Sequence, residues 1–267
     1  MIRFVIIFAL VFLSVHINVA AQVLNIDREK REDSLLKTWD IAVGLSLSSD
    51  KQKRNLLESN TSLEFVRNLP SRYFVAGILR NDLEYNGPTQ IQNEGLVHFR
   101  FRDRDTRKYS PELFIQTIWN GQWGLEYRHY VGASIRARLL EKKGLDLYTG
   151  LGLLQEWERW NWSGVRPELQ PSVQSKIFVN RWRVNQYFKL SARAGEWVDF
   201  SAISYFQPGI SSGNILPRWY VDANVYFKAG EKFSLVLHWD HILDSTPSVP
   251  IDNLFYGFSV GILYSNR

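Results

Sequence analysis

The stretch 125–157 alternates between apolar and polar residues with a period of two. Val131 and Ile135 fall on one side of an extended chain, and Arg128 falls on the other. A turn at 141–144 separates this run from a second run with the same alternation. The pattern therefore predicts two antiparallel strands joined as a hairpin.

The polar side of this hairpin carries more charge than the core of a water-soluble protein accepts. Three arginines, an aspartate and a glutamate share it, and each unpaired buried charge is strongly destabilising. Lipid is the solvent that accepts apolar rows on the outside of a sheet whose inside is polar. The hairpin thus predicts an all-β fold, an antiparallel up-and-down transmembrane β-barrel.

The same alternation recurs along the chain and predicts about twelve strands, an even number that is typical of such barrels. The predicted runs are 38–48, 57–67, 72–85, 94–102, 109–120, 125–139, 145–157, 181–190, 198–206, 218–228, 233–239 and 257–264. The connections near 68, 103, 141, 194 and 230 are tight, whereas those near 50, 86, 158, 208 and 241 are mostly longer. This alternation is typical of short periplasmic turns and longer extracellular loops.

The N-terminus has the pattern of a cleaved signal peptide over residues 1–21. Arg3 precedes an apolar run, and small residues stand at 19–21 before Gln22. The apolar run is shorter than the roughly 18–20 residues that span a bilayer. We expect residues 22–37 to form a polar periplasmic arm and residues 38–267 to form the barrel as one domain.

Composition narrows the function classes. The chain has 267 residues, no cysteine, 14% aromatic residues and a formal net charge of +5. The lack of cysteine excludes disulfide frameworks and thiolate metal sites. Because lysine and arginine are interspersed with aspartate and glutamate, no basic stripe is present and nucleic acid is not expected as a partner.

The polar rows supply a set of charged residues that we expect to line the lumen. If these charges pair across the interior they plug it, and if they segregate on opposite walls they line a narrow polar channel for small solutes. The sequence leaves both alternatives open. The predicted lumen residues are Glu58, Glu64, Glu94, His98, Arg100, Arg102, Glu112, Arg128, Arg136, Arg138, Asp146, Glu156, Arg181, Arg183, Arg218 and Asp222.

Catalytic and metal sites have little support in the sequence. His129 faces lipid by parity, but Ser134 has the opposite parity and no serine stands in a recognised nucleophile motif. The inward acids and histidines lack a short metal-ligand spacing. We therefore expect no catalytic residue, metal or cofactor.

Three segments carry a resemblance to a known family. They are Arg-His-Tyr-Val-Gly at 128–132, Gly-Leu-Gly at 150–152 followed by Glu156, and Tyr-Phe-Gln-Pro at 205–208. From about residue 38 onward, the chain resembles the domain of unknown function 481 family of salt-induced outer-membrane proteins. The resemblance implies an outer-membrane barrel of a Gram-negative bacterium without an assigned activity, and it brings no catalytic residue.

Pattern and resemblance together favour an integral outer-membrane protein with a structural or narrow small-solute channel role and no catalytic activity. Its expected partners are outer-membrane lipids, lipopolysaccharide and the barrel-assembly machinery. A lipid-modifying outer-membrane hydrolase is the first alternative. The second is a soluble periplasmic β-protein in which the apolar rows face an ordinary core.

Overall fold

A computed structural model of the protein describes residues 39–51, 55–69, 73–103, 108–211, 214–230 and 233–264. The predicted signal peptide (1–21) and polar arm (22–37) lie outside the described residues. Apart from a short 3₁₀ helix, η1 (Pro167–Leu169), the regular structure of the described residues is all β. Within this part of the chain, no helix has the length and hydropathy needed to cross a membrane.

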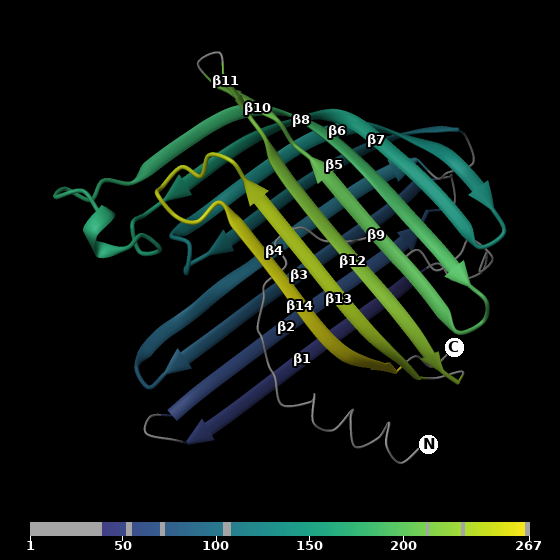
Figure 1. Ribbon diagram of the computed structural model, residues 1–267, viewed down its shortest axis with the longest axis horizontal. Coiled ribbons are helices and arrows are strands. Elements are labelled where there is room, and N and C mark those ends of the chain that lie inside the picture. The colour runs from purple at the N-terminus through teal and green to yellow at the C-terminus, as the bar shows by residue number, and fades with distance from the viewer. Residues whose placement is uncertain are drawn as a thin grey trace.

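Twelve long strands follow one another in a single antiparallel, up-and-down sheet (Figure 1). They are β1 (Trp39–Lys51), β2 (Asn55–Asn68), β3 (Tyr73–Asn86), β4 (Thr89–Asp103), β5 (Tyr109–Asn120), β6 (Leu125–Lys142), β7 (Leu145–Trp160), β8 (Ile177–Ala194), β9 (Val198–Phe206), β12 (Arg218–Ala229), β13 (Phe233–Asp244) and β14 (Leu254–Tyr264). The short strands β10 (Gly209–Ser211) and β11 (Asn214–Leu216) form a hairpin beside this path. The predicted all-β, antiparallel up-and-down fold and the predicted number of strands are confirmed.

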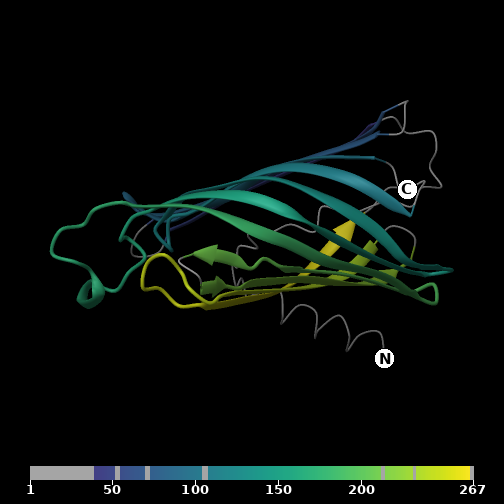
Figure 2. The ribbon, with the colours of Figure 1, turned by 90° about the horizontal axis from the view of Figure 1, so that it is seen from above.

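The sheet curls into a barrel around a filled interior. Figure 2 shows the blue and teal strands of the first half forming one layer and the green and yellow strands of the second half forming the other. Side chains meet across the interior, since Arg100 of β4 donates to Tyr205 of β9. Among the described strands, the pairing runs without interruption from β1 to β14.

The two faces of the sheet separate as the period of two predicts. Val131 and Leu151 point outward and are 50% and 59% exposed, whereas Arg136 and Glu156 point inward and are buried. Extended backbone places successive side chains on opposite faces, so a row of alternating residues becomes one apolar wall and one polar wall. Tight turns keep the register of the neighbouring strands, and Gly144 provides the positive φ that the β6–β7 turn needs.

The interior is more apolar than the sequence predicts. Phe74 and Ile78 of β3 are buried together with Leu96, Phe114 and Leu154, which all point inward. These residues share the parity of the charged residues around them, so the alternation alone does not distinguish them. An apolar cluster therefore fills one part of the barrel beside the charged part.

Some local predictions are wrong. Leu125 has the same parity as Val131, so the alternation predicts that it faces outward. A register shift between Leu125 and Tyr127 turns it inward, where it is buried. Strand β7 continues through Glu158, where a loop was expected, and β13 continues to Asp244. The hairpin β10–β11 occupies part of the predicted loop 208–217.

The connections differ in length between the two ends of the barrel. One end, named here the loop end, carries the segments 161–176, 207–217 and 245–253. The opposite end, named here the turn end, carries short connections such as 143–144. The connection near 86, which was expected to be longer, is short, and the one near 50 falls on residues 52–54, outside the described residues. Among the described connections, the long ones lie in the second half of the chain.

Candidate functional site

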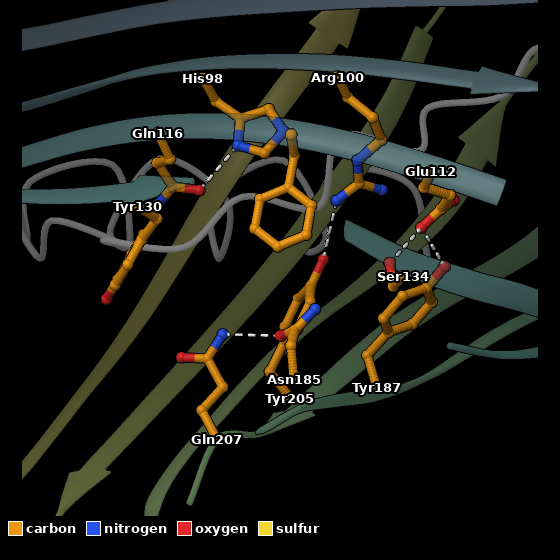
Figure 3. Close-up of a pocket in the computed structure, with 11 residues that line it drawn as sticks. His98, Arg100, Glu112, Gln116, Tyr130, Ser134, Asn185, Tyr187, Tyr205 and Gln207 are labelled. Atoms are coloured by element: carbon orange, nitrogen blue, oxygen red, sulfur yellow. Dashed lines mark hydrogen bonds between the residues drawn. The ribbon is translucent and has the colours of Figure 1, made fainter. Parts of the chain in front are cut away.

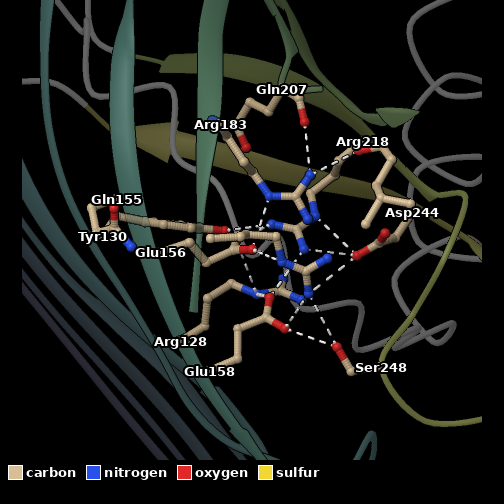
Figure 4. A network of polar contacts seen from close by, with 12 residues as sticks. Arg128, Tyr130, Gln155, Glu156, Glu158, Arg183, Gln207, Arg218, Asp244 and Ser248 are labelled. Carbon is tan, nitrogen blue, oxygen red and sulfur yellow. Dashed lines mark hydrogen bonds and ion pairs between the residues drawn. The ribbon is translucent and has the colours of Figure 1, made fainter. Parts of the chain in front are cut away.

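A network of buried ion pairs spans the barrel near the loop end (Figure 4). Its members come from the ends of five strands and from the β13–β14 loop (245–253), which lie far apart in the sequence. The charge network consists of Arg128 of β6, Glu156 and Glu158 of β7, Arg181 and Arg183 of β8, Arg218 of β12, Asp244 of β13, and Ser248 of the loop.

Glu156 is the most enclosed acid of the charge network and is fully buried. Its Oε1 accepts from Nε of Arg183 at 2.8 Å and lies 3.0 Å from Nε of Arg181. Its Oε2 accepts from Nη1 of Arg218 at 2.5 Å. Nε of Arg128 lies 3.8 Å from the same oxygen. Four guanidinium groups thus surround one carboxylate, which is how a charge remains stable in a water-poor interior.

Glu158 repeats this arrangement two residues further along β7. Its Oε1 accepts from Nε of Arg128 at 2.6 Å and from Nη2 of Arg218 at 3.1 Å. Its Oε2 accepts from Nη2 of Arg181 and from the indole of Trp160, at 3.1 and 2.9 Å. All four carboxylate oxygens of the two glutamates are therefore engaged, and the arginines that contact them come from β6, β8 and β12.

Arg218 connects the network across the barrel. Its Nε donates to Oδ2 of Asp244 at 2.9 Å, and its Nη1 also donates to the hydroxyl of Tyr130 at 3.0 Å. Since it contacts both glutamates as well, one side chain links β12 to β6, β7 and β13. The network holds the second half of the sheet against the first.

The β13–β14 loop covers the network. The hydroxyl of Ser248 donates to Oε2 of Glu158 at 3.1 Å and accepts from Nη2 of Arg181 at 3.2 Å. The next residue, Val249, is 2% exposed and belongs to the interior apolar cluster. The β13–β14 loop therefore folds into the mouth of the barrel rather than away from it.

A second polar group lies deeper in the barrel around Glu112 (Figure 3). Oε2 of Glu112 accepts from Tyr187 at 2.8 Å and from Ser134 at 3.3 Å. Its Oε1 lies 3.6 Å from Arg102 and 3.9 Å from Arg136. These side chains come from β4, β5, β6 and β8, so they also join opposite parts of the wall.

A small cavity adjoins Glu112, with a volume of about 20 Å³. His98, Gln116, Tyr205 and Gln207 are among its lining residues. One buried water needs roughly 10–15 Å³. The cavity thus has room for one or two water molecules and is far smaller than a sugar or an amino acid.

Two buried acids lie side by side in the middle of the wall formed by β12 and β13. Asp222 and Asp240 stand directly opposite each other on these strands, and both are buried. His238 lies between them, with Nδ1 3.9 Å from Asp222 and Nε2 3.5 Å from Asp240. A like-charged pair in this position is unfavourable unless a cation or a proton is shared.

The predicted lumen residues divide into two groups by burial. Those that are buried are Glu94, His98, Arg100, Arg102, Glu112, Arg128, Arg136, Glu156, Arg183, Arg218 and Asp222. Those that are partly exposed are Glu58, Glu64, Arg138, Asp146 and Arg181. The structure brings Arg128, Glu156, Arg181, Arg183 and Arg218 into one network, whereas Glu64 pairs separately with Arg80.

Four members of these interactions were missed in the sequence. Glu158 has the same parity as Glu156, so extending the alternation by two residues would have found it. Asp244 was assigned to a loop, although it ends β13. Tyr130 has inward parity but carries no charge, and Ser248 lies in a loop without any periodic signal.

The two residues considered for catalysis lie on opposite faces. Nδ1 of His129 lies 3.0 Å from the hydroxyl of Thr117 on the outer face, whereas Ser134 donates to Glu112 on the inner face. His129 and Ser134 therefore do not form a pair. In the part of the chain that the structure describes, no group of three or more His, Cys, Asp or Glu side chains is arranged to hold a metal ion.

The comparison with solved structures gives ten matching chains, one of which is described below. No family model and no curated protein matches the chain, so membership of the domain of unknown function 481 family stays a prediction. A crystal structure of the NanC porin in a rhombohedral form is similar over 85% of this chain and 99% of its own, with 10% sequence identity and a TM-score of 0.45. An overlap this loose carries neither the fold nor an activity over to this chain.

Proposed function

We propose that the chain is an integral outer-membrane β-barrel of a Gram-negative bacterium with a structural role, conducting small solutes narrowly if at all and catalysing no reaction. The loop end faces outward from the cell and the turn end faces the periplasm. Its surroundings are outer-membrane lipids and lipopolysaccharide, and the barrel-assembly machinery inserts it.

Position in a membrane is supported by the outer wall of the barrel. Large apolar side chains are exposed along the strands in rows, which a water-soluble protein rarely tolerates over such an area. Strand β7 has 16 residues, more than the roughly 9–11 that a tilted strand needs to cross a bilayer. The exposed residues include Val97, Ile115, Val131, Ile135, Leu151, Leu153, Phe188, Trp219, Leu235 and Ile262.

The charge network is the observation that carries the structural role. Glu156 and Glu158 pair with arginines from β6, β8 and β12, so the charges lie in contact rather than on separated walls. The β13–β14 loop covers them, and the cavity beside Glu112 holds little more than a water molecule. A filled interior of this kind suits a rigid scaffold better than an open pore.

Conductance in a planar bilayer tests the filled interior. We expect the purified wild-type protein to insert without forming steady open channels. The variant Val249→Asp places a charge in the apolar cluster and should release the β13–β14 loop, raising the frequency of channel opening. A matched control is Glu168→Gln, which changes an exposed residue of η1 and should behave like the wild type.

Steady wide channels in the wild type would contradict the structural role. If Val249→Asp forms channels as rarely as the wild type, the β13–β14 loop does not close the mouth of the barrel.

The position in the membrane is tested separately, by membrane fractionation followed by gel mobility with and without heating. We expect recovery in the outer-membrane fraction and a heat-modifiable band. Recovery in buffer without detergent would favour the soluble alternative.

A further inference from the structure

The outer face of the barrel carries a cationic group at the loop ends of β6, β7 and β8. Nε of Arg159 pairs with Oε2 of Glu126. Lys176, immediately before β8, lies 2.9 Å from the other oxygen of this carboxylate. Asn161 also donates to Glu126 at 3.3 Å. Two cations therefore share one acid, which leaves a formal charge of +1 on this surface.

A bulge in β6 creates this arrangement. The register shift between Leu125 and Tyr127 turns Leu125 inward and leaves Glu126 to contact the side chains of the outer face. Tyr127 then lies beneath Arg159, whose guanidinium is 4.7 Å from the centre of the ring. Stacking on an aromatic ring fixes the plane of the guanidinium and reduces the entropy lost when it binds a ligand.

Both cations remain accessible. The side chains of Arg159 and Lys176 are 37% and 52% exposed. The ion pair with Glu126 runs through Nε of Arg159, so it does not use the two terminal nitrogens of the guanidinium. A planar guanidinium with two open nitrogens can bind two oxygens of one phosphate or carboxylate.

The cations stand at the edge of the apolar wall. Along the outward row of β7, the apolar Leu151 and Leu153 are followed by Gln155, then by Trp157, and finally by Arg159. Gln155 bonds with Asn180 of β8, which marks the point where polar side chains replace apolar ones. Tryptophan at such a level is typical of the interface between hydrocarbon and headgroups.

Taking the membrane position proposed above as given, we propose that Arg159 and Lys176 bind a phosphate group of a phosphorylated lipid, lipid A of lipopolysaccharide, in the leaflet at the loop end. The acyl chains would lie along the apolar row of β7, and Gln155 and Trp157 separate the last leucine of this row, Leu153, from the cations. The aromatic rings of Tyr127 and Trp157 would lie at the level of the sugar headgroup. Glu126 holds the two cations together without neutralising both.

Lipid binding in detergent micelles tests this site. Native mass spectrometry would count the lipids retained with bisphosphorylated lipid A and with chemically dephosphorylated lipid A of the same acyl composition. We expect the wild type to retain the phosphorylated form at least several-fold better. The double variant Arg159→Gln, Lys176→Gln should lose this preference and bind both forms equally.

A matched control changes two exposed lysines at the turn end, Lys142→Gln and Lys143→Gln, with the same loss of charge. This control should keep the preference. An equal preference in the wild type and the Arg159, Lys176 double variant would overturn the site, as would no preference in a folded wild type. Heat-modifiable mobility of each variant shows that it is folded, and a wild type that stays soluble without detergent would instead overturn the membrane position itself.

Discussion

At the scale of single residues, the structure shows how charged side chains remain inside a narrow barrel. Glu156 is tolerated there because four arginines surround it. Burying an ion pair gives little net stability, but removing one partner leaves the other charges unpaired and is strongly destabilising. Each arginine of the charge network thus depends on the glutamates of β7.

Replacing Glu156 by alanine should therefore destabilise the folded barrel by about 3–5 kcal/mol, the cost of leaving buried charges without a partner. Equilibrium unfolding in urea, followed by tryptophan fluorescence in detergent, measures the change. Glu168→Ala on the exposed surface of η1 provides the control and should change the free energy of unfolding little. A Glu156→Ala variant as stable as the control would refute the structural role of the network.

The outer wall makes a different prediction for residues that carry no charge. Leu151 lies midway along the outward row of β7 and is well exposed. Leu151→Arg should cost about 2–4 kcal/mol, because an arginine near the middle of the bilayer loses its hydration. Leu139→Arg, near the turn end of β6, should cost only about 0–1 kcal/mol, since a charge near the interface reaches water.

Unfolding in liposomes would measure both variants against the wild type. Equal effects of the two arginines, or none, would show that the outward row does not face hydrocarbon.

On the inner face, the hydrogen bonds of a residue limit which substitutions it accepts, in addition to its place in the alternation. The alternation places Ser134 on the polar inner face, where aspartate alone would be acceptable. Its hydroxyl donates to Glu112, however, so a second carboxylate there would be repelled.

At the scale of strands and turns, small residues on the inner face make room for aromatic rings. Gly150 of β7 stands opposite Tyr187 of β8. A Cβ atom added to Gly150 would lie 2.0 Å from the ring of Tyr187. That ring also holds Glu112 through its hydroxyl, so the glycine positions a member of the second polar group.

Gly150→Ala should consequently destabilise the barrel by about 1–3 kcal/mol, the usual cost of overpacking. It should also shift the absorbance of the tyrosines, because Tyr187 must move. The control is Gly261→Ala on β14, where an added Cβ meets no atom within 4 Å. If the two variants unfold at the same urea concentration, Tyr187 is not packed against Gly150.

The sequence predicts the strands well because the signal is local. Alternation assigns a face to each residue wherever the register is regular, as for Val131 and Arg136. It fails at Leu125, because a single extra residue in a bulge reverses the parity without any change in composition. It also fails to identify the apolar cluster, since Phe114 has the same parity as Glu112.

The side-chain contacts within the candidate site could not be predicted from the sequence, for another reason. Arg218 contacts Glu156 and Glu158 across the barrel, at separations of about sixty residues. Which strands face each other depends on the curvature of the whole sheet and not on any local pattern. The sequence therefore identified the charges but left open whether they pair or segregate.

At the scale of the whole molecule, two walls of opposite character explain the fold. The outer wall is apolar and the inner wall holds paired charges and a buried apolar cluster. This arrangement suits a barrel in lipid with a filled interior. The proposed lipid A site lies where the apolar outer wall ends. A soluble protein would need the opposite order of faces.

A single-cysteine scan tests this claim most directly, because the chain has no cysteine of its own. Spin labels at Ala133, Ile135, Leu151 and Leu153 on the outer face, and at Ser134 on the inner face, would be studied in liposomes. The account predicts high accessibility to oxygen and low accessibility to a water-soluble nickel complex at the four outer positions, with a buried, immobile label at Ser134. Outer positions that are accessible to the nickel complex and closed to oxygen would contradict it.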